Sequence, residues 1–266
     1  MDRSRRLHLA LALASLTVLP FTASANERHF TYTYETAVLP PGGREVEVWT
    51  TARLGRDGYY TGFDERVEFE VGLTERLQTS LYLNLNSVTQ RVGGELQSST
   101  NFDGVSNEWK YKLMDPVADA FGLALYGELG LKPDELELEA KLILDKRIGP
   151  VLLAANLVLE NGVEFEAEET EPELALELVG GASYFFTPHF SLGVEVRNTN
   201  LFPEYESWEF SALHAGPVVS YASDNWWVSL TVLPQLPALK RTEGGGTLVL
   251  TEHEKFNARL LFSFHL

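Results

Sequence analysis

The chain has 266 residues, a formal net charge of −17 and no cysteine. The lack of cysteine excludes disulfides, thiolate metal sites and a lipoprotein anchor, and the acidic balance excludes nucleic-acid binding driven by attraction to phosphates. Neither property excludes a membrane protein, provided that the charged side chains stay off the lipid-facing surface.

Residues 1–25 have the three parts of a secretory signal peptide. Three arginines come first, a short apolar run follows, and Ala23-Ser24-Ala25 forms an A-x-A cleavage site. The apolar run is too short for a spanning helix, which needs roughly 20 apolar residues. We therefore predict cleavage after Ala25, which removes three arginines and one aspartate and changes the net charge to about −19.

From residue 44 onward the chain alternates between apolar and polar side chains, as expected for strands with one apolar face. The clearest example is residues 136–145, where four leucines and an alanine face one way and four charged residues face the other. Twelve such segments follow in chain order, at residues 44–54, 66–73, 77–86, 105–113, 121–131, 136–145, 151–160, 173–184, 190–197, 207–221, 226–233 and 256–266.

The connections between these segments alternate in length. Those after the second, fourth, sixth, eighth and tenth segments are tight turns, and most of the others are longer and polar, among them residues 87–102. Pro217 cannot donate to a strand ladder, so we expect a bulge beside Gly216. Short periplasmic turns, longer outer loops and an even strand number are typical of outer-membrane barrels.

The sequence therefore predicts an all-β fold, a twelve-stranded antiparallel transmembrane β-barrel of the outer-membrane type. The barrel would occupy residues 44–266, preceded by an N-terminal periplasmic segment at residues 26–43. Most of the segments have about 9 to 12 residues, which is long enough to cross the hydrocarbon layer when the strands are tilted. The expected location is the outer membrane, with lipid and lipopolysaccharide around the wall.

The C-terminal segment, residues 256–266, has a wholly apolar face. It consists of Phe256, Ala258, Leu260, Phe262, Phe264 and Leu266. An aromatic strand that ends at the C-terminus is typical of outer-membrane barrels, and we expect the barrel-assembly machinery to bind this strand. A soluble lipocalin-like barrel or β-sandwich would bury the same faces, but it explains neither the twelve strands nor the alternating connections.

Several motifs carry a resemblance to a known family. They are Tyr34-Glu35-Thr36, Leu39-Pro40, Trp49-Thr50, Glu108-Trp109-Lys110-Tyr111, Gly181-Ala182-Ser183-Tyr184, Thr187-Pro188, Leu192-Gly193-Val194-Glu195, Gly216-Pro217, Trp226-Trp227-Val228 and Leu233-Pro234-Gln235-Leu236. With these motifs the chain resembles a family of uncharacterised Gram-negative outer-membrane β-barrels, and its pattern is similar to the barrels grouped with the MetA pathway of phenol degradation. The resemblance covers nearly all of the mature chain and implies location and fold, but no activity.

The charged faces of the strands would line the lumen of such a barrel. The lumen-facing candidates are Glu45, Glu47, Glu68, Glu70, Glu108, Lys110, Lys112, Glu128, Glu137, Glu139, Lys141, Glu195, Arg197 and Arg259. An excess of carboxylates in a narrow wet lumen favours cations, so one hypothesis is a narrow channel for small solutes. The other is a closed barrel in which these charges pair across the lumen and fill it.

An enzyme is the third hypothesis, since some twelve-stranded outer-membrane barrels are phospholipases. Such a site needs a serine and a histidine within hydrogen-bond reach near the outer rim. His253 has no obvious serine beside it, and the facing of His214 and of the seventh, tenth and eleventh strands does not follow from the pattern. The acidic run at residues 164–171 lacks the spacing of a calcium loop. We expect no catalytic residues, no metal and no cofactor.

Overall fold

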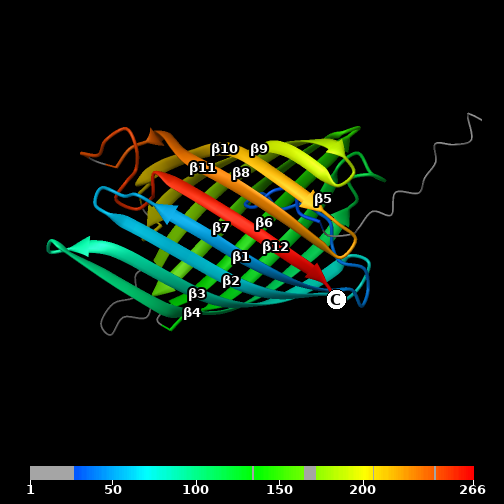
Figure 1. Cartoon of the computed structure of the whole chain (residues 1–266), viewed down its shortest axis with the longest axis horizontal. Coiled ribbons are helices and arrows are strands. Elements are labelled where there is room, and N and C mark those ends of the chain that lie inside the picture. The colour runs from blue at the N-terminus through cyan, green and yellow to red at the C-terminus, as the bar shows by residue number, and fades with distance from the viewer. Residues whose placement is uncertain (1–26, 134, 165–171, 206, 243) are drawn as a thin grey trace, which may run out of the picture.

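The structure is a computed structural model that describes residues 27–133, 135–164, 172–205, 207–242 and 244–266 (Figure 1). The predicted signal peptide and most of the acidic run at residues 164–171 lie outside the described residues. No helix in the described part of the chain is long and apolar enough to cross a membrane.

Twelve antiparallel strands of the described residues close into a barrel, in which each strand pairs with its neighbours in sequence and β1 pairs with β12. The prediction of an all-β, twelve-stranded antiparallel barrel is thereby confirmed. The strands are β1 (Arg44–Leu54), β2 (Tyr60–Gly72), β3 (Leu77–Val92), β4 (Glu95–Met114), β5 (Gly122–Leu131), β6 (Glu135–Ile148), β7 (Val151–Glu164), β8 (Pro172–Thr187), β9 (Phe190–Pro203), β10 (Phe210–Ala222), β11 (Trp226–Lys240) and β12 (Phe256–His265).

The C-terminal strand β12 closes the barrel. It pairs with β11 on one side and with β1 on the other, in a register that sets Val46 opposite Phe264 and Val48 opposite Phe262 (Figure 1). Both faces of β12 match those of β1, apolar outside and polar inside. Closure satisfies the backbone groups that an open edge would leave unpaired, and in lipid those groups have no water to bind.

The apolar faces of the strands point outward. Leu81 and Leu83 on β3 are 62% and 55% exposed, whereas Tyr82 between them is 1% exposed. On β1, Glu45 and Glu47 are fully buried and Val48 is exposed. Leucine, valine and phenylalanine rows therefore surround the barrel and the carboxylates face its interior, the reverse of a soluble protein. The soluble alternative is wrong, and the outer surface is suited to lipid.

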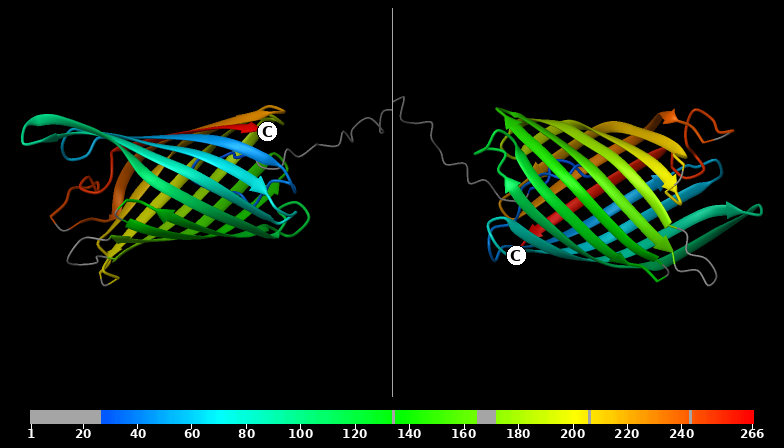
Figure 2. Two further views of the ribbon diagram at one scale, coloured as in Figure 1. Left: turned by 90° about the horizontal axis from the view of Figure 1, so that it is seen from below. Right: turned by 180° about the vertical axis from the view of Figure 1, so that it is seen from behind.

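The predicted loop at residues 87–102 is instead the outer part of β3 and β4. The two strands stay paired as far as Val92 and Glu95, and Gly93 and Gly94, with φ of 61° and 94°, form a two-residue turn. Positive φ at both central residues is the type I′ geometry that fits the twist of a hairpin. This hairpin extends past the other strands (Figures 1 and 2). Its polar, exposed side chains on both faces hide the strand pattern in the sequence.

The predicted bulge beside Gly216 is also wrong. The register of β10 against β11 is the same at His214 and at Val218, and the irregularity lies between Ser211 and Leu213. Gly216 has another role, because a Cβ atom there would lie 1.9 Å from the backbone oxygen of Val232. The glycine permits a close approach of two strands where Pro217 leaves the ladder without a donor.

The outward direction of the apolar rows yields a first prediction. We expect Leu81→Lys to lower the free energy of unfolding by about 2 to 4 kcal/mol, because the ammonium group would lie in the hydrocarbon layer. Gln90→Lys is the matched control on the same strand, since Gln90 is exposed on the extended hairpin. Unfolding of the refolded protein in lipid vesicles measures both, and equal stability of the two variants would contradict the assignment of the outer face.

Candidate functional site

Most of residues 27–43, here called the plug segment, lies inside the barrel, whereas Pro40, Pro41 and Gly42 are exposed ahead of β1. Phe30, Thr31, Thr33 and Thr36 have no exposed surface, although the segment contains no strand. It leads into β1 at the end where the tight turns lie, the predicted periplasmic end (Figure 1). We predicted a periplasmic segment ahead of the barrel, and the sequence analysis did not anticipate that these residues fold back into the lumen.

One carboxylate holds the start of the plug segment. Glu195 on β9 is fully buried and accepts hydrogen bonds from the backbone N–H groups of Thr31, Tyr32 and Thr33, at 3.1, 3.0 and 2.8 Å. The hydroxyl of Thr231 on β11 donates to the same carboxylate. Three consecutive N–H groups that point at one anion leave no unpaired donor in this turn of the chain, and hydrogen bonds to a charged acceptor are among the stronger ones.

Polar side chains of other strands hold the rest of the plug segment. Asn156 on β7 accepts from the backbone N–H of Tyr34 at 2.6 Å and donates to its carbonyl at 3.0 Å. Asp145 on β6 accepts from the backbone N–H and the hydroxyl of Thr36, at 3.0 and 2.7 Å. Gln78 on β3 accepts a further backbone N–H near the end of the segment. The lumen wall thus supplies the backbone partners that a sheet would otherwise provide.

Cations and aromatic rings fill the space around the plug segment. The ammonium nitrogen of Lys141 lies 4.0 Å from the ring centre of Tyr34 and 4.1 Å from that of Tyr126. The guanidinium of Arg259 lies 4.0 Å from the ring centre of Tyr32. Attraction between a cation and a ring face is strengthened where water is excluded. These contacts bind the aromatic side chains of the plug segment to the barrel wall.

Several other lumen charges form ion pairs. Arg66 pairs with Glu128 at 2.5 Å, and Lys141 pairs with Glu139 at 2.6 Å. Arg197 binds Glu177 through two hydrogen bonds, a geometry that fits the planar guanidinium. The lumen wall around the plug segment therefore carries a network of paired charges.

The structure divides the fourteen lumen-facing candidates into three groups. Glu128, Glu139, Lys141, Arg197 and Arg259 join the network around the plug segment, and Glu195 anchors the plug itself. Toward the periplasmic end lie Lys110, Lys112, which pairs with Asp115, and a cluster of five buried carboxylates, Glu45, Glu47, Glu68, Glu70 and Glu108. Glu137 lies near the outer end, where it binds Lys132 at 2.6 Å.

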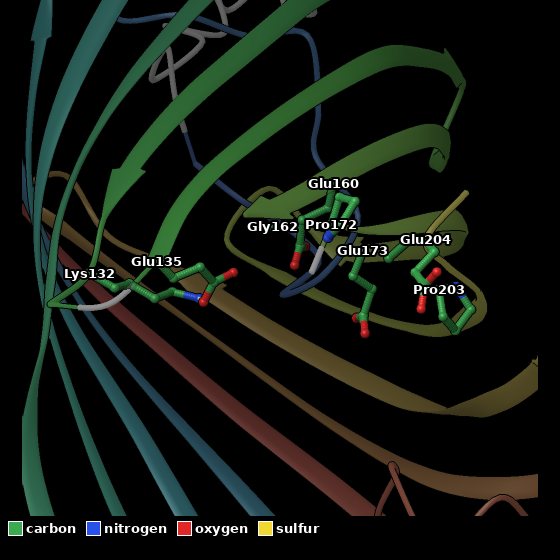
Figure 3. Close-up of a pocket in the computed structure, with 9 residues that line it drawn as sticks. Lys132, Glu135, Glu160, Gly162, Pro172, Glu173, Pro203 and Glu204 are labelled. Atoms are coloured by element: carbon green, nitrogen blue, oxygen red, sulfur yellow. The ribbon is translucent and has the colours of Figure 1, made fainter. Parts of the chain in front are cut away.

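An acidic cavity of about 350 Å³ opens at the outer end of the lumen (Figure 3). We call it the outer vestibule. Its charged lining consists of Glu135, Glu160, Glu173, Glu204 and Lys132. Lys132 is bound to Glu135 at 2.9 Å, so the carboxylates outnumber the cation. Sequence reasoning missed Glu160 and Glu204, because the seventh strand could not be oriented and Glu204 follows the end of a strand.

The chain between β11 and β12 also enters the outer lumen. Val249 is fully buried, and its backbone N–H and carbonyl bind the side-chain amide of Gln235 at 2.7 and 2.9 Å. Glu254 pairs with Arg56 at 2.6 Å. His214, whose facing the sequence left open, points inward and lies 3.3 Å from the carbonyl of Glu254. This loop narrows the lumen beside the outer vestibule.

No serine hydroxyl is hydrogen-bonded to a histidine ring among the described residues. His214 and His253 stack edge to face with a ring separation of 5.7 Å, and His29 binds Glu35 at 3.0 Å. The lumen network therefore orders the plug segment, and among the described residues it does not bring together the nucleophile and base of a serine hydrolase.

The hydrogen bonds of Glu195 yield a second prediction. We expect Glu195→Gln to speed amide hydrogen exchange at residues 31–33 by at least about ten-fold, because the loss of charged acceptor bonds costs about 1.5 to 3 kcal/mol each. Glu160→Gln, in the outer vestibule, is the control. If exchange at these three residues is equally slow in both variants, Glu195 is not the anchor of the plug segment.

Comparisons with known proteins agree with this architecture. The COG4313 outer membrane channel from Pseudomonas putida F1 superposes with a TM-score of 0.60 at 12% identity, over 89% of this chain and 100% of that chain. The NanC porin superposes with a TM-score of 0.56 at 11% identity, over 83% of this chain and 100% of that chain. Likeness at such low identity shows the fold alone. No curated protein matches the sequence. The profile of a family of unknown function, DUF6662, matches residues 22–266, and the chain therefore belongs to that family.

Proposed function

We propose that this protein is an outer-membrane channel for small solutes with a preference for cations, and that the plug segment closes it in the state described here. The single observation that carries the proposal is a closed barrel, of a fold shared with outer-membrane channels, whose charged side chains face inward. A barrel of twelve strands is wider than the filled eight-stranded kind and narrower than an open porin.

The outer vestibule supports the preference for cations. Its four carboxylates face one lysine, and that lysine already binds Glu135 and Glu137. A negative cleft with low-dielectric walls concentrates field lines and raises the local concentration of cations. Cationic or neutral solutes of small size would therefore enter the vestibule more readily than anions.

The plug segment supports a channel that opens and closes. Residues 27–43 are held by hydrogen bonds, ion pairs and cation–ring contacts, none of which is covalent, and they are joined to the barrel through β1. Such contacts can be exchanged for water one after another when the segment withdraws toward the periplasm. The lumen that it leaves would retain the carboxylates that now accept its N–H groups.

A closed barrel without transport is the second candidate. Two segments inside the lumen favour this candidate. The plug segment occupies the periplasmic end, and the chain around the buried residues Val249 and Glu254 occupies the outer end. In that case the paired charges serve only to satisfy the interior. The two candidates differ in whether removal of the plug segment produces a conducting pore.

The family resemblance, the C-terminal strand and the apolar outer wall are also part of this proposal. The resemblance to the barrels grouped with the MetA pathway of phenol degradation supports the location in the outer membrane and names no solute. The aromatic strand β12, at the seam with β1, is where the barrel-assembly machinery would bind. Outer-membrane lipid and lipopolysaccharide would cover the apolar wall.

A third prediction tests transport. We expect deletion of residues 27–39 to raise single-channel conductance in planar bilayers several-fold above that of the intact chain, because the lumen loses its filling. Deletion of residues 90–97, at the tip of the extended hairpin, is the control, since these residues lie outside the lumen. Should neither the intact nor the plug-deleted protein conduct above background, the closed barrel is the better description.

A fourth prediction tests the charge preference in the plug-deleted background. We expect Glu160→Lys with Glu173→Lys to shift the reversal potential in a salt gradient toward anion preference, because the vestibule charge changes sign. Glu95→Lys with Glu252→Lys changes the net charge equally at exposed outer positions. If both pairs of substitutions shift the potential alike, the outer vestibule does not set selectivity.

A further inference from the structure

Five carboxylates meet on the lumen wall near the periplasmic end. Glu45 and Glu47 lie on β1, Glu68 and Glu70 on β2, and Glu108 on β4, and each is at most 4% exposed. One oxygen from each of Glu68, Glu70 and Glu108 lies within 4.8 Å of the others, and the same holds for Glu45, Glu47 and Glu70. Glu70 belongs to both triads.

The strand register brings these side chains together. Glu45 pairs with Glu70, Glu70 with Ser80 of β3, and Ser80 with Glu108, so that four inward side chains form one row around the barrel. Side chains directly opposite one another on antiparallel strands have Cβ atoms about 4.5 to 5.5 Å apart. Like charges in such positions repel, so the row needs a compensating group.

Several polar atoms in this row and in the neighbouring residue Glu68 have no hydrogen-bond partner. Both carboxylate oxygens of Glu68 are unpartnered at 1% exposure, as is one oxygen of Glu108. The hydroxyl of Ser80, also 1% exposed, is unpartnered although it stands between Glu70 and Glu108 in the register. Burying a carboxylate or a hydroxyl without a hydrogen-bond partner destabilises the folded protein, unless the carboxylate takes up a proton. The unpartnered atoms therefore point to a missing partner.

The cations of the protein do not supply that partner. Lys110 on β4 and Arg28 of the plug segment act on the cluster through their charge. Among the described residues, however, neither makes an ion pair within 4.0 Å of Glu68 or Glu108. His265 lies 3.8 Å from Glu45 and adds at most one further positive charge, so the five carboxylates outnumber the cations around them in a region with almost no exposed surface.

The two triads differ in the oxygens that remain free. Glu45 accepts hydrogen bonds from the indole of Trp227 and from Ser263, and Glu47 accepts one from the indole of Trp49 at 2.8 Å. The other oxygen of Glu47 accepts nothing, and in the second triad both oxygens of Glu68 and one of Glu108 accept nothing. Three of the four unpartnered carboxylate oxygens of the cluster therefore belong to Glu68 and Glu108, and Ser80 adds an unpartnered hydroxyl.

We propose that Glu68, Glu70 and Glu108, with the hydroxyl of Ser80, form a binding site for a divalent cation of the Ca²⁺ class. All the donors are hard oxygens, and no nitrogen or sulfur ligand is present to favour a transition metal. Ca²⁺ takes 6 to 8 oxygens at about 2.3 to 2.6 Å, and oxygens within 4.8 Å of one another can surround one such ion. Mg²⁺ is disfavoured, because it demands a strict octahedron and keeps its waters.

The bound ion would join β2 and β4 across β3 beneath the plug segment. It would neutralise the carboxylates that the strand register forces together, and it would thereby stabilise the barrel wall beside Gln78, which binds the plug backbone. The site does not depend on whether the protein conducts. It exists in the closed state described here, and a barrel without transport would have it too.

Tb³⁺ luminescence tests the site, because Tb³⁺ replaces Ca²⁺ at oxygen sites and is excited by a nearby tryptophan, here Trp49. On the full mature chain, refolded in detergent and freed of metal with a chelator, we expect saturable emission at one ion per chain. Ca²⁺ should displace Tb³⁺ at lower concentration than Mg²⁺ does. Absence of saturable binding, or equal displacement by the two ions, would overturn the proposal.

Variants assign the binding to these residues. We expect Glu70→Gln to weaken Tb³⁺ binding at least about ten-fold and Glu252→Gln, at an exposed position before β12, to leave it unchanged. Ser80→Ala, which keeps every carboxylate, should weaken binding several-fold and serves if Glu70→Gln does not fold. Binding that both Glu70→Gln and Ser80→Ala leave intact would place the ion elsewhere and refute the site.

Thermal unfolding gives a readout that does not use Tb³⁺. Ca²⁺ should raise the midpoint of the chelator-treated protein, and it should raise that of Ser80→Ala less. If the carboxylates are instead neutralised by protons alone, lowering the pH stabilises the protein whereas Ca²⁺ does not, and that result would refute cation binding.

Discussion

The carboxylate of Glu195 accepts hydrogen bonds from three consecutive backbone N–H groups of the plug segment, and the position of that segment inside the barrel depends on this contact. Residues 31–33 form no strand and are shielded from water, so without Glu195 their donors would be buried unpaired. Asn156 and Asp145 likewise accept backbone N–H groups farther along the segment. A chain without secondary structure is thus ordered by side chains of the sheet that surrounds it.

A barrel with charged side chains in its interior needs partners for those charges. In this protein the kind of partner changes along the barrel axis. Around the plug segment, arginine and lysine pair with carboxylates and lie over aromatic rings, as Lys141 does with Glu139 and Tyr34. At the outer end, carboxylates border a cavity that water can fill. Near the periplasmic end, Glu68 and Ser80 lack a partner within the described part of the chain. The three regions therefore differ in what can bind there.

Strand alternation predicted which side chains face inward, because a period of two is a local property of each strand. It could not predict the partner of Glu195, since that partner is a segment 162 to 164 residues away with no periodic pattern. The outer ends of β3 and β4 were not predicted as strands for a related reason. Outside the membrane neither face needs apolar residues, so the pairing that Gly93 and Gly94 initiate left no alternating signal. Glu160 was missed because its strand is apolar on both faces.

The acidic lumen and the position of the plug segment both depend on how the lumen carboxylates are neutralised. A carboxylate such as Glu195 can be neutralised by backbone N–H groups or by a cation in water, and the two compete for the same oxygens. With the plug in place, the N–H groups occupy Glu195 and the threonine hydroxyls cover it. With the plug withdrawn, the same oxygens would face a wet lumen and attract cations. Under the proposed function, closure and cation preference therefore depend on one set of side chains, and a substitution that weakens the plug also weakens the attraction that a permeating cation would feel.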